Sequence, residues 1–182
     1  HGCVALFVST SAANGSVGRM NKWKHDSLFS SKDQSWQTPR WLFDFMDSRH
    51  HFDLDAAATP DSALCESFIS PDEDALTLKE WPGRRIWLNP PYGRQVGQFV
   101  AKAKEQAALG KLVVVLIFAR TDTKWWHDSA MSAQDIYLVR GRLRFERNGT
   151  TEGAAPAPSA LLVFNGSAVT EASPRFHQLD QP

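Results

Sequence analysis

The sequence predicts an α/β domain whose sheet is mostly parallel with an antiparallel edge. Segments of strand and helix character alternate through the first part of the chain, and the last part is rich in strands. Between these parts, the run 112–118 is entirely apolar and mostly β-branched. Alternating strands and helices build parallel sheets covered by helices, and a fully apolar strand is typical of a sheet buried on both faces. Consecutive strands near the end of the chain favour antiparallel pairing there.

In the first half of the chain, the expected elements follow from start and stop signals. Thr38 and Pro39 suit the N-cap and the first residue of a helix, and apolar residues then recur at helical spacing over about ten residues. Residues 52–56 alternate as a short strand that enters a turn of small residues, 56–60. The other expectations are a short helix over 61–68, a strand over 85–88 that two prolines stop, and a helix over 95–109 that ends before Gly110.

In the second half, the apolar run 112–118 predicts a buried strand. We expect a helix over 125–133 and further strands over 136–139, 142–147 and 160–164. The domain is expected to span residues 32–168. It would lie between a flexible N-terminal tail, 1–31, rich in Ser, Gly, Asn and Ala, and a C-terminal tail, 169–182.

Composition and charge restrict the classes of function. The 182 residues suit one domain with a sizeable core, since 42% of them are hydrophobic. Twenty basic residues balance twenty acidic ones, so any nucleic-acid site must be a local patch. The longest apolar run has eight residues, too few for a membrane helix. Cys3 and Cys65 have no disulfide or zinc spacing, which fits a reducing cytoplasm, and the histidines show no metal spacing.

The strongest functional signal is Asn89-Pro90-Pro91-Tyr92, directly after the strand 85–88. Open α/β sheets bind ligands at the carboxyl ends of their strands, and the two prolines, Pro90 and Pro91, hold this loop rigid. The Asn89 side-chain oxygen and the Pro90 carbonyl can each accept a hydrogen bond from one NH2 group. Such acceptance turns the delocalised lone pair of a planar amine outward, toward a sulfonium methyl placed in line. The Tyr92 ring can stack on a planar substrate such as a flipped base.

This loop predicts a methyltransferase that uses S-adenosylmethionine and acts on a planar NH2 group, and it leaves the acceptor open. The alternative without function is that Asn-Pro-Pro-Tyr is simply a turn. A carboxamide and a guanine amine pose the same chemical problem as adenine. A protein-glutamine methyltransferase and a ribosomal-RNA guanine methyltransferase are therefore alternatives, and a catalytically silent DNA-binding relative is the non-enzymatic one.

Seven segments, in order, resemble the phage-type DNA N6-adenine methyltransferases, the Dam-like family of phages and prophages. They are Trp36-Gln37-Thr38-Pro39, Phe52-Asp53-Leu54-Asp55-Ala56-Ala57, Asp74-Ala75-Leu76 followed by Trp81, Trp87-Leu88-Asn89-Pro90-Pro91-Tyr92-Gly93, Ala119-Arg120-Thr121-Asp122-Thr123-Lys124-Trp125-Trp126, Gly141-Arg142-Leu143-Arg144-Phe145 and Ala155-Pro156-Ala157-Pro158-Ser159-Ala160. The protein-glutamine family resembles the chain only at the Asn-Pro-Pro-Tyr loop. The resemblance implies the Rossmann-like fold of S-adenosylmethionine-dependent methyltransferases and adenine in double-stranded DNA as the acceptor. It also implies a cytoplasmic enzyme of a bacterial host, without metal or membrane, and a monomer is favoured.

The resemblance further implies three donor-binding segments. They are Gln37, Thr38 and Pro39 near the methionine end of the donor, Asp55, Ala56 and Ala57 in the first turn, and Asp74, Ala75 and Leu76 against its adenine. The chain departs from the pattern in two ways: alanines replace the glycine-rich turn, and no clear second strand ends in an acidic ribose ligand. Glu66 and the pair Asp72–Glu73 are the candidates for that ligand. Each segment also has a structural alternative, namely a helix start at Thr38, a turn capped by Asp55 and a solvated acidic loop over 72–74.

Basic and aromatic residues in the second half are candidates for DNA contacts. They are Arg120, Lys124 and Trp125 after the run 112–118, and Arg142 and Arg144, which alternate along a strand. The alternatives are a core position for Trp125 and a solvated edge for the arginines. We expect loops to recognise the target sequence in DNA, because no large separate recognition domain fits in the chain.

Overall fold

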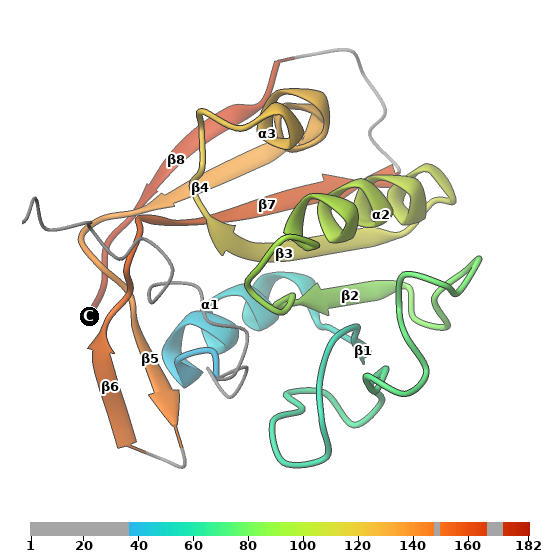
Figure 1. Cartoon of the computed structure of the whole chain (residues 1–182), viewed down its shortest axis with the longest axis horizontal. Coiled ribbons are helices and arrows are strands. Elements are labelled where there is room, and N and C mark those ends of the chain that lie inside the picture. Colours follow the sequence, from blue (N-terminus) through green and yellow to red (C-terminus); the bar gives the residue numbers. More distant parts are fainter. Residues whose placement is uncertain (1–36, 148–149, 167–172) are drawn as a thin grey trace, which may run out of the picture.

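The computed structural model describes residues 37–147, 150–166 and 173–182, and it contains a six-stranded sheet with helices on both faces (Figure 1). In chain order the elements are α1 (Arg40–His50), β1 (Leu54–Asp55), β2 (Arg85–Leu88), α2 (Val96–Ala108), β3 (Leu112–Phe118), α3 (Lys124–Asp128), the 3₁₀ helix η2 (Ala130–Ser132), β4 (Asp135–Val139), β5 (Arg144–Arg147), β6 (Thr150–Ala154), β7 (Ser159–Asn165) and β8 (Arg175–Leu179). The predicted tail 1–31 lies outside the described residues.

The strand order is β1-β2-β3-β7-β4-β8. β1, β2 and β3 pair in parallel, as do β4 and β8, while β7 is antiparallel to both β3 and β4. The prediction of a mixed and mostly parallel sheet is confirmed. Its antiparallel pairing involves β7, a strand from the last part of the chain. The antiparallel strand β7 is itself flanked by β3 and β4, and β8 is outermost. β5 and β6 form a separate hairpin beyond the end of β4 (Figure 1).

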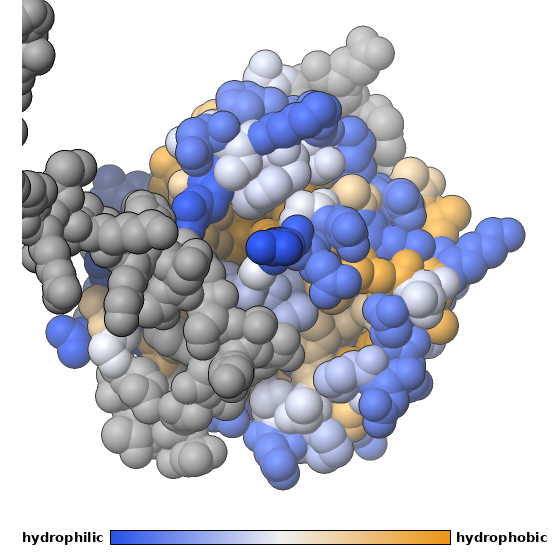
Figure 2. All heavy atoms as spheres, in the orientation of Figure 1, coloured by the Kyte–Doolittle hydropathy of each residue, from blue (hydrophilic) through white to orange (hydrophobic). Residues whose placement is uncertain are grey.

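Side chains of β3 alternate between two apolar layers. Val113 and Ile117 pack with α2 and α3 on one face, whereas Val114 and Leu116 pack with α1 on the other. All four are fully buried, so the sheet is covered on both faces, as its apolar composition predicted. On the surface shown in Figure 2, hydrophilic residues surround separate hydrophobic patches.

Most predicted elements form close to their expected residues. The strands predicted over 85–88 and 112–118 form there as β2 and β3. The helix predicted over 95–109 forms as α2, and Gly110 follows it with a φ of +85°. The helix expected over 125–133 is divided into α3 and η2. The strands expected over 136–139, 142–147 and 160–164 form as β4, β5 and β7, with ends that differ by at most two residues.

The helix expected over 61–68 is wrong. This segment ends in an extended stretch beside β1, where Asp55 and Phe68 form a parallel bridge. The Asp55 N–H donates to the Ser67 carbonyl at 3.0 Å, and the Ile69 N–H donates to the Asp55 carbonyl at 2.9 Å. These bonds pair backbone groups of β1 that the short helix would leave without partners at the edge of the sheet.

The expected C-terminal tail, 169–182, also needs correction, because it contains β8. Asp135 of β4 anchors this strand: it accepts two hydrogen bonds from Arg175, each 2.8 Å long, and its Oδ1 lies 2.7 Å from His177 Nε2. The hydrogen bonds from Arg175 lower the pKa of Asp135, with His177 adding to the effect. The domain therefore extends to β8. No helix in the described parts of the chain is long and apolar enough to cross a membrane.

Candidate active site

The first two parallel strands end side by side, and the two candidate loops start from these ends. Asp55 is in register with Trp87, and the Ala56 N–H donates to the Trp87 carbonyl at 2.8 Å. The turn after β1 and the Asn89 loop after β2 are therefore neighbours at the carboxyl edge of the sheet. This edge is where open α/β sheets bind their ligands.

Asn89 is held by a side chain from the start of α1. Its Nδ2 donates to Thr38 Oγ1 at 3.1 Å, across 51 positions of sequence. Asn89 Oδ1 is buried and has no hydrogen-bond partner among the described residues. The sequence predicted Thr38 as the N-cap of α1, and this is wrong. Pro39 occupies the N-cap position, and its side chain cannot cap the helix.

Pro90 provides the second expected acceptor. Pro90 is buried, and no described residue donates a hydrogen bond to its carbonyl. Together with Asn89 Oδ1, this carbonyl leaves the loop with unused acceptors and no competing donor among residues 37–147, 150–166 and 173–182. An NH2 group has two hydrogens to donate, which matches two free acceptors.

The Tyr92 ring packs on an aromatic cluster of the chain itself. It stacks on Phe118 with ring centroids 4.2 Å apart and an interplanar angle of 25°, and it makes a T-shaped contact with Phe145, with ring centroids 5.7 Å apart. Its hydroxyl is buried without a partner in the described residues, and burial raises the pKa of Tyr92 well above its usual range. One face of the ring is therefore already covered, so a planar substrate would have to use the other face.

Asp55 closes the turn that follows β1. It is 3% exposed, and its two oxygens accept hydrogen bonds from the Ala57 N–H at 3.3 Å and the Leu64 N–H at 3.2 Å. Burial raises the pKa of Asp55 to about 6, and these two hydrogen bonds oppose the rise. The carboxylate therefore shapes the backbone of the turn, in which Ala56 is buried and Ala57 half-buried.

The segment from Asp74 to Trp81, which precedes β2, forms a second rigid loop. Asp74 has a φ of +51°, and its Oδ1 accepts from the Leu76 N–H at 3.1 Å. The Trp81 indole N–H donates to the Ala75 carbonyl at 2.8 Å, and the Trp81 backbone N–H donates to Gln106 Oε1 at 2.8 Å. Ala75 is consequently fixed in the core, and Leu76 packs at its border.

Gln37 lies at the other end of the donor-binding candidates. Its Nε2 lies 3.4 Å from the Asp61 carbonyl, which connects the start of α1 with the loop after β1. Thr38 and Pro39, both buried, join this contact to the Asn89 loop. The structure thus brings Gln37 to Asp61, in the loop after β1, and Thr38 to the Asn89 loop.

Comparison with known proteins decides the family. A family model described as DNA N-6-adenine-methyltransferase (Dam) matches residues 25–172. The chain belongs to this family. It is 34% identical over 151 residues to a DNA N-6-adenine-methyltransferase of Haemophilus phage HP1, covering 80% of this chain and 86% of that protein. It is also 34% identical over 137 residues to a DNA N-6-adenine-methyltransferase of Escherichia phage T1, covering 74% of this chain but only 56% of the phage T1 protein.

The resemblance seen in the sequence is therefore confirmed. The candidates for the acidic ribose ligand, Glu66 and the pair Asp72–Glu73, lie on either side of the stretch that pairs with β1. The stretch beside β1 acts as an additional parallel segment, and residues 70–73 follow its end. Glu73 Oε2 accepts from the Ser70 N–H at 2.9 Å and the Ser70 hydroxyl at 3.0 Å, and these bonds lower its pKa. Asp72 is exposed beside it. Position after a parallel segment favours the pair 72–73 over Glu66, which precedes that segment.

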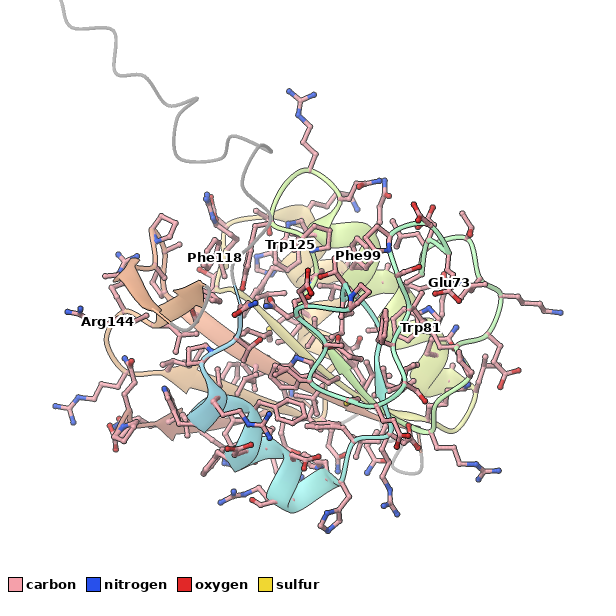
Figure 3. All side chains as sticks on the ribbon, turned by 90° about the horizontal axis from the view of Figure 1, so that it is seen from below. Glu73, Trp81, Phe99, Phe118, Trp125 and Arg144 are labelled. Carbon is pink, nitrogen blue, oxygen red and sulfur yellow. The ribbon has the colours of Figure 1, made fainter. Side chains whose placement is uncertain are left out.

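The DNA-binding candidates of the Dam-family chain fall in two places. Arg142 and Arg144 are exposed near the hairpin β5–β6, while Leu143 and Phe145 between and beside them are buried. Figure 3 shows Arg144 pointing outward on the side of the molecule opposite Glu73 and Trp81. The Arg142 guanidinium lies 3.4 Å from the Ala155 carbonyl.

The other candidates follow β3. Lys124 is exposed and pairs with Asp128 of the same helix, and Arg120 is half-buried. Trp125 packs closely on α2: a Cβ added at Gly97 would lie 2.8 Å from the Trp125 Cβ. This contact agrees with the structural alternative for Trp125.

Three residues of this region were not singled out from the sequence as site residues. Phe118 stacks on the Tyr92 ring, and Gln106 accepts a hydrogen bond from the Trp81 backbone N–H. Ser159, in register with Phe118, is 1% exposed, and its hydroxyl has no partner among the described residues. In the sequence, the only indication that Phe118 and Ser159 lie near the site is their position at the ends of predicted strands. Across the described ranges, no group of three or more His, Cys, Asp or Glu side chains could hold a metal ion.

Proposed function

We propose that this chain transfers a methyl group from S-adenosylmethionine to the N6 amine of a flipped adenine in double-stranded DNA. The observation that carries the proposal is the pair of free acceptors in the Asn89 loop. Asn89 Oδ1 is buried without a partner, and the Pro90 carbonyl accepts no hydrogen bond from the described residues. Membership of the Dam family selects adenine in DNA among the planar amines.

The residues of the loop act on the amine. Asn89 Oδ1 and the Pro90 carbonyl accept its two hydrogens, which directs the nitrogen lone pair toward the methyl carbon. S-adenosylmethionine supplies that methyl group as an electrophile bound to a sulfonium. A nitrogen–carbon bond forms as the sulfur–carbon bond breaks, the sulfur keeps the electron pair, and the amine then loses one proton to water. Pro91 fixes the loop, and Tyr92 stacks on the base with the face that Phe118 leaves free.

For the donor, we infer a Rossmann-like methyltransferase fold in which the carboxyl ends of β1 and β2 hold the ligand. Support comes from the parallel pairing of these strands and from the rigid turns that follow them. Gln37, Thr38 and Pro39 would lie at the methionine end, Asp55, Ala56 and Ala57 beside the first turn, and Asp74, Ala75 and Leu76 against the adenine, with Asp72 the ribose ligand. Arg120, Lys124, Trp125, Arg142 and Arg144 would contact the DNA. We also propose that the chain acts as a monomer, without metal, in the cytoplasm of a bacterial host.

The test follows labelled methyl from S-adenosylmethionine into unmethylated duplex DNA, which is then digested and analysed for N6-methyladenine. We expect transfer by the wild-type chain and a loss on the order of 10²–10³-fold in Asn89→Ala, since a preorganised polar contact to the reacting group is removed. Gln178→Ala, at an exposed amide of β8, is the control and should transfer normally. Label in protein or RNA but not in DNA would refute the proposal.

A further inference from the structure

The orientation of the Asn89 amide is set by a residue outside the Asn-Pro-Pro-Tyr loop. We propose that Thr38 is a positioning residue for catalysis: its hydroxyl accepts from Asn89 Nδ2 and thereby directs Asn89 Oδ1 toward the amine that receives the methyl group. This role rests on the proposed function of Asn89. It differs from donor binding, the role that the family pattern implied for Thr38.

Thr38 is placed well for such a role because its surroundings are rigid. Thr38 is 4% exposed. The next residue, Pro39, accepts hydrogen bonds at its carbonyl from the Leu42 N–H at 3.0 Å and the Phe43 N–H at 3.3 Å, which start α1. Leu42 and Phe43 are in turn buried against the sheet. The hydroxyl therefore cannot move away from the loop without disturbing the packing of the helix.

The chemistry requires one particular orientation of the Asn89 amide. An amide has an acceptor end and a donor end, and the target amine offers only hydrogens while its lone pair attacks the methyl carbon. The Oδ1 end must then face the amine, so Nδ2 must find an acceptor within the protein. Thr38 Oγ1, at 3.1 Å, is the acceptor that the structure provides. An inverted amide would direct a donor at the amine and lose the catalytic hydrogen bond.

The experiment compares Thr38→Val with Thr38→Ser. Valine has nearly the shape of threonine but no acceptor, whereas serine keeps the hydroxyl. We expect Thr38→Val to lower kcat by about 10- to 100-fold, with KM for S-adenosylmethionine and for DNA changed less than about two-fold, because ground-state binding is preserved. Thr38→Ser should restore most of the lost kcat. Met46→Ala, a core truncation on the same helix, is the control for lost stability and should leave kcat per folded molecule at the wild-type value.

A double-mutant cycle tests whether Thr38 acts through Asn89. In the Asn89→Ala background, measured in single turnovers, Thr38→Val should cause no further loss. Unchanged kcat in Thr38→Val would overturn the positioning role, and so would a raised KM for S-adenosylmethionine at normal kcat, which would assign Thr38 to the donor instead. Equal losses in the serine and valine variants would also overturn it. If the wild-type chain itself transfers no methyl to DNA, the proposed function fails, and the role of Thr38 fails with it.

Discussion

The two segments on either side of β2, the Asn89 loop after it and the segment from Asp55 to Trp81 before it, treat their polar groups in opposite ways. In the Asn89 loop, Asn89 Oδ1 and the Tyr92 hydroxyl are buried without partners among the described residues. In the segment from Asp55 to Trp81, by contrast, the buried polar groups are used by the chain itself. Asp55 accepts two backbone N–H groups, and Trp81 and Gln106 bond to each other and to nearby backbone.

This difference indicates what each loop is built to contact. A buried polar atom without a partner costs about 1–3 kcal/mol, and such atoms need an explanation where they occur. A ligand that brings the missing partner would explain them, which supports the proposal that the Asn89 loop, the proposed acceptor side, receives polar groups of the substrate. The segment from Asp55 to Trp81, the proposed donor side, instead offers a fixed backbone and apolar walls such as Ala75 and Leu76. We expect polar substitutions to affect catalysis on the first side and donor binding on the second.

On the acceptor side, the largest effect expected after that of Asn89→Ala concerns Tyr92. Tyr92→Ala removes the ring that stacks on Phe118 and that we propose to stack on the base. We expect kcat/KM for DNA to fall by about 10- to 100-fold, since a base–aromatic stack contributes about 1–3 kcal/mol. Tyr92→Phe keeps the ring and removes the unpartnered hydroxyl. It should raise the stability of the free protein by about 1 kcal/mol, measured by chemical unfolding. A less stable Tyr92→Phe would show that the hydroxyl has a partner in the folded chain and would weaken the comparison between the loops.

On the donor side, Gln106→Leu removes the side-chain amide that bonds to the backbone of Lys79 and Trp81. We call these hydrogen bonds the Gln106 network. Gln106 is fully buried, accepts from the Trp81 N–H at 2.8 Å and donates to the Lys79 carbonyl at 3.1 Å. Leucine leaves both backbone groups unpaired, which should cost on the order of 1–3 kcal/mol for each group. We expect a lower Tm and a raised KM for S-adenosylmethionine, with kcat at saturating donor little changed.

Gln98→Leu on the exposed side of α2 is the matched control, because it makes the same exchange without touching the loop. It should leave both the Tm and the KM for the donor at their wild-type values. A loss of kcat in Gln106→Leu at unchanged KM would mean that the network supports the acceptor side, and the division between the two loops would be wrong.

Much of the fold could be predicted because its signals are local. The apolar run of β3 and the proline pair after β2 specify strand and loop without reference to the rest of the chain. β8 gave no such signal, because its polar side chains are held by Asp135, 40 positions earlier in the sequence. The segment 61–68 was misread as a helix for a similar reason: its end pairs with the edge of β1, which only the folded sheet creates.

The site shows the same limit. The role of Asn89 as a hydrogen-bond acceptor stays a prediction, and it could be made from four consecutive residues and the strand before them. The orientation of its side chain could not be predicted, since the hydrogen bond that Asn89 donates to Thr38 spans 51 positions. The sequence also predicted that Tyr92 offers its ring to a base, but Phe118 covers one face of that ring, and only the pairing of β2 with β3 brings the two together. Long-range pairing therefore decides the features that local patterns leave open.

The effect expected for Asp55 is on stability alone and appears only as a dependence on pH. Burial raises the pKa of Asp55 in the folded chain to about 6 from an ordinary 3.8, so the folded state binds this proton more tightly than the unfolded state does. Below about pH 4 both states are protonated and the effect is absent, whereas above about pH 6 the buried charge lowers stability in full. Asp55→Asn cannot ionise, so the free energy of unfolding of the wild type, relative to this variant, should fall by up to about 3 kcal/mol between these limits. Chemical unfolding of both proteins across this pH range measures the difference. A difference that rises with pH would mean that the hydrogen bonds from Ala57 and Leu64 outweigh burial, and the donor side would then favour the charged carboxylate.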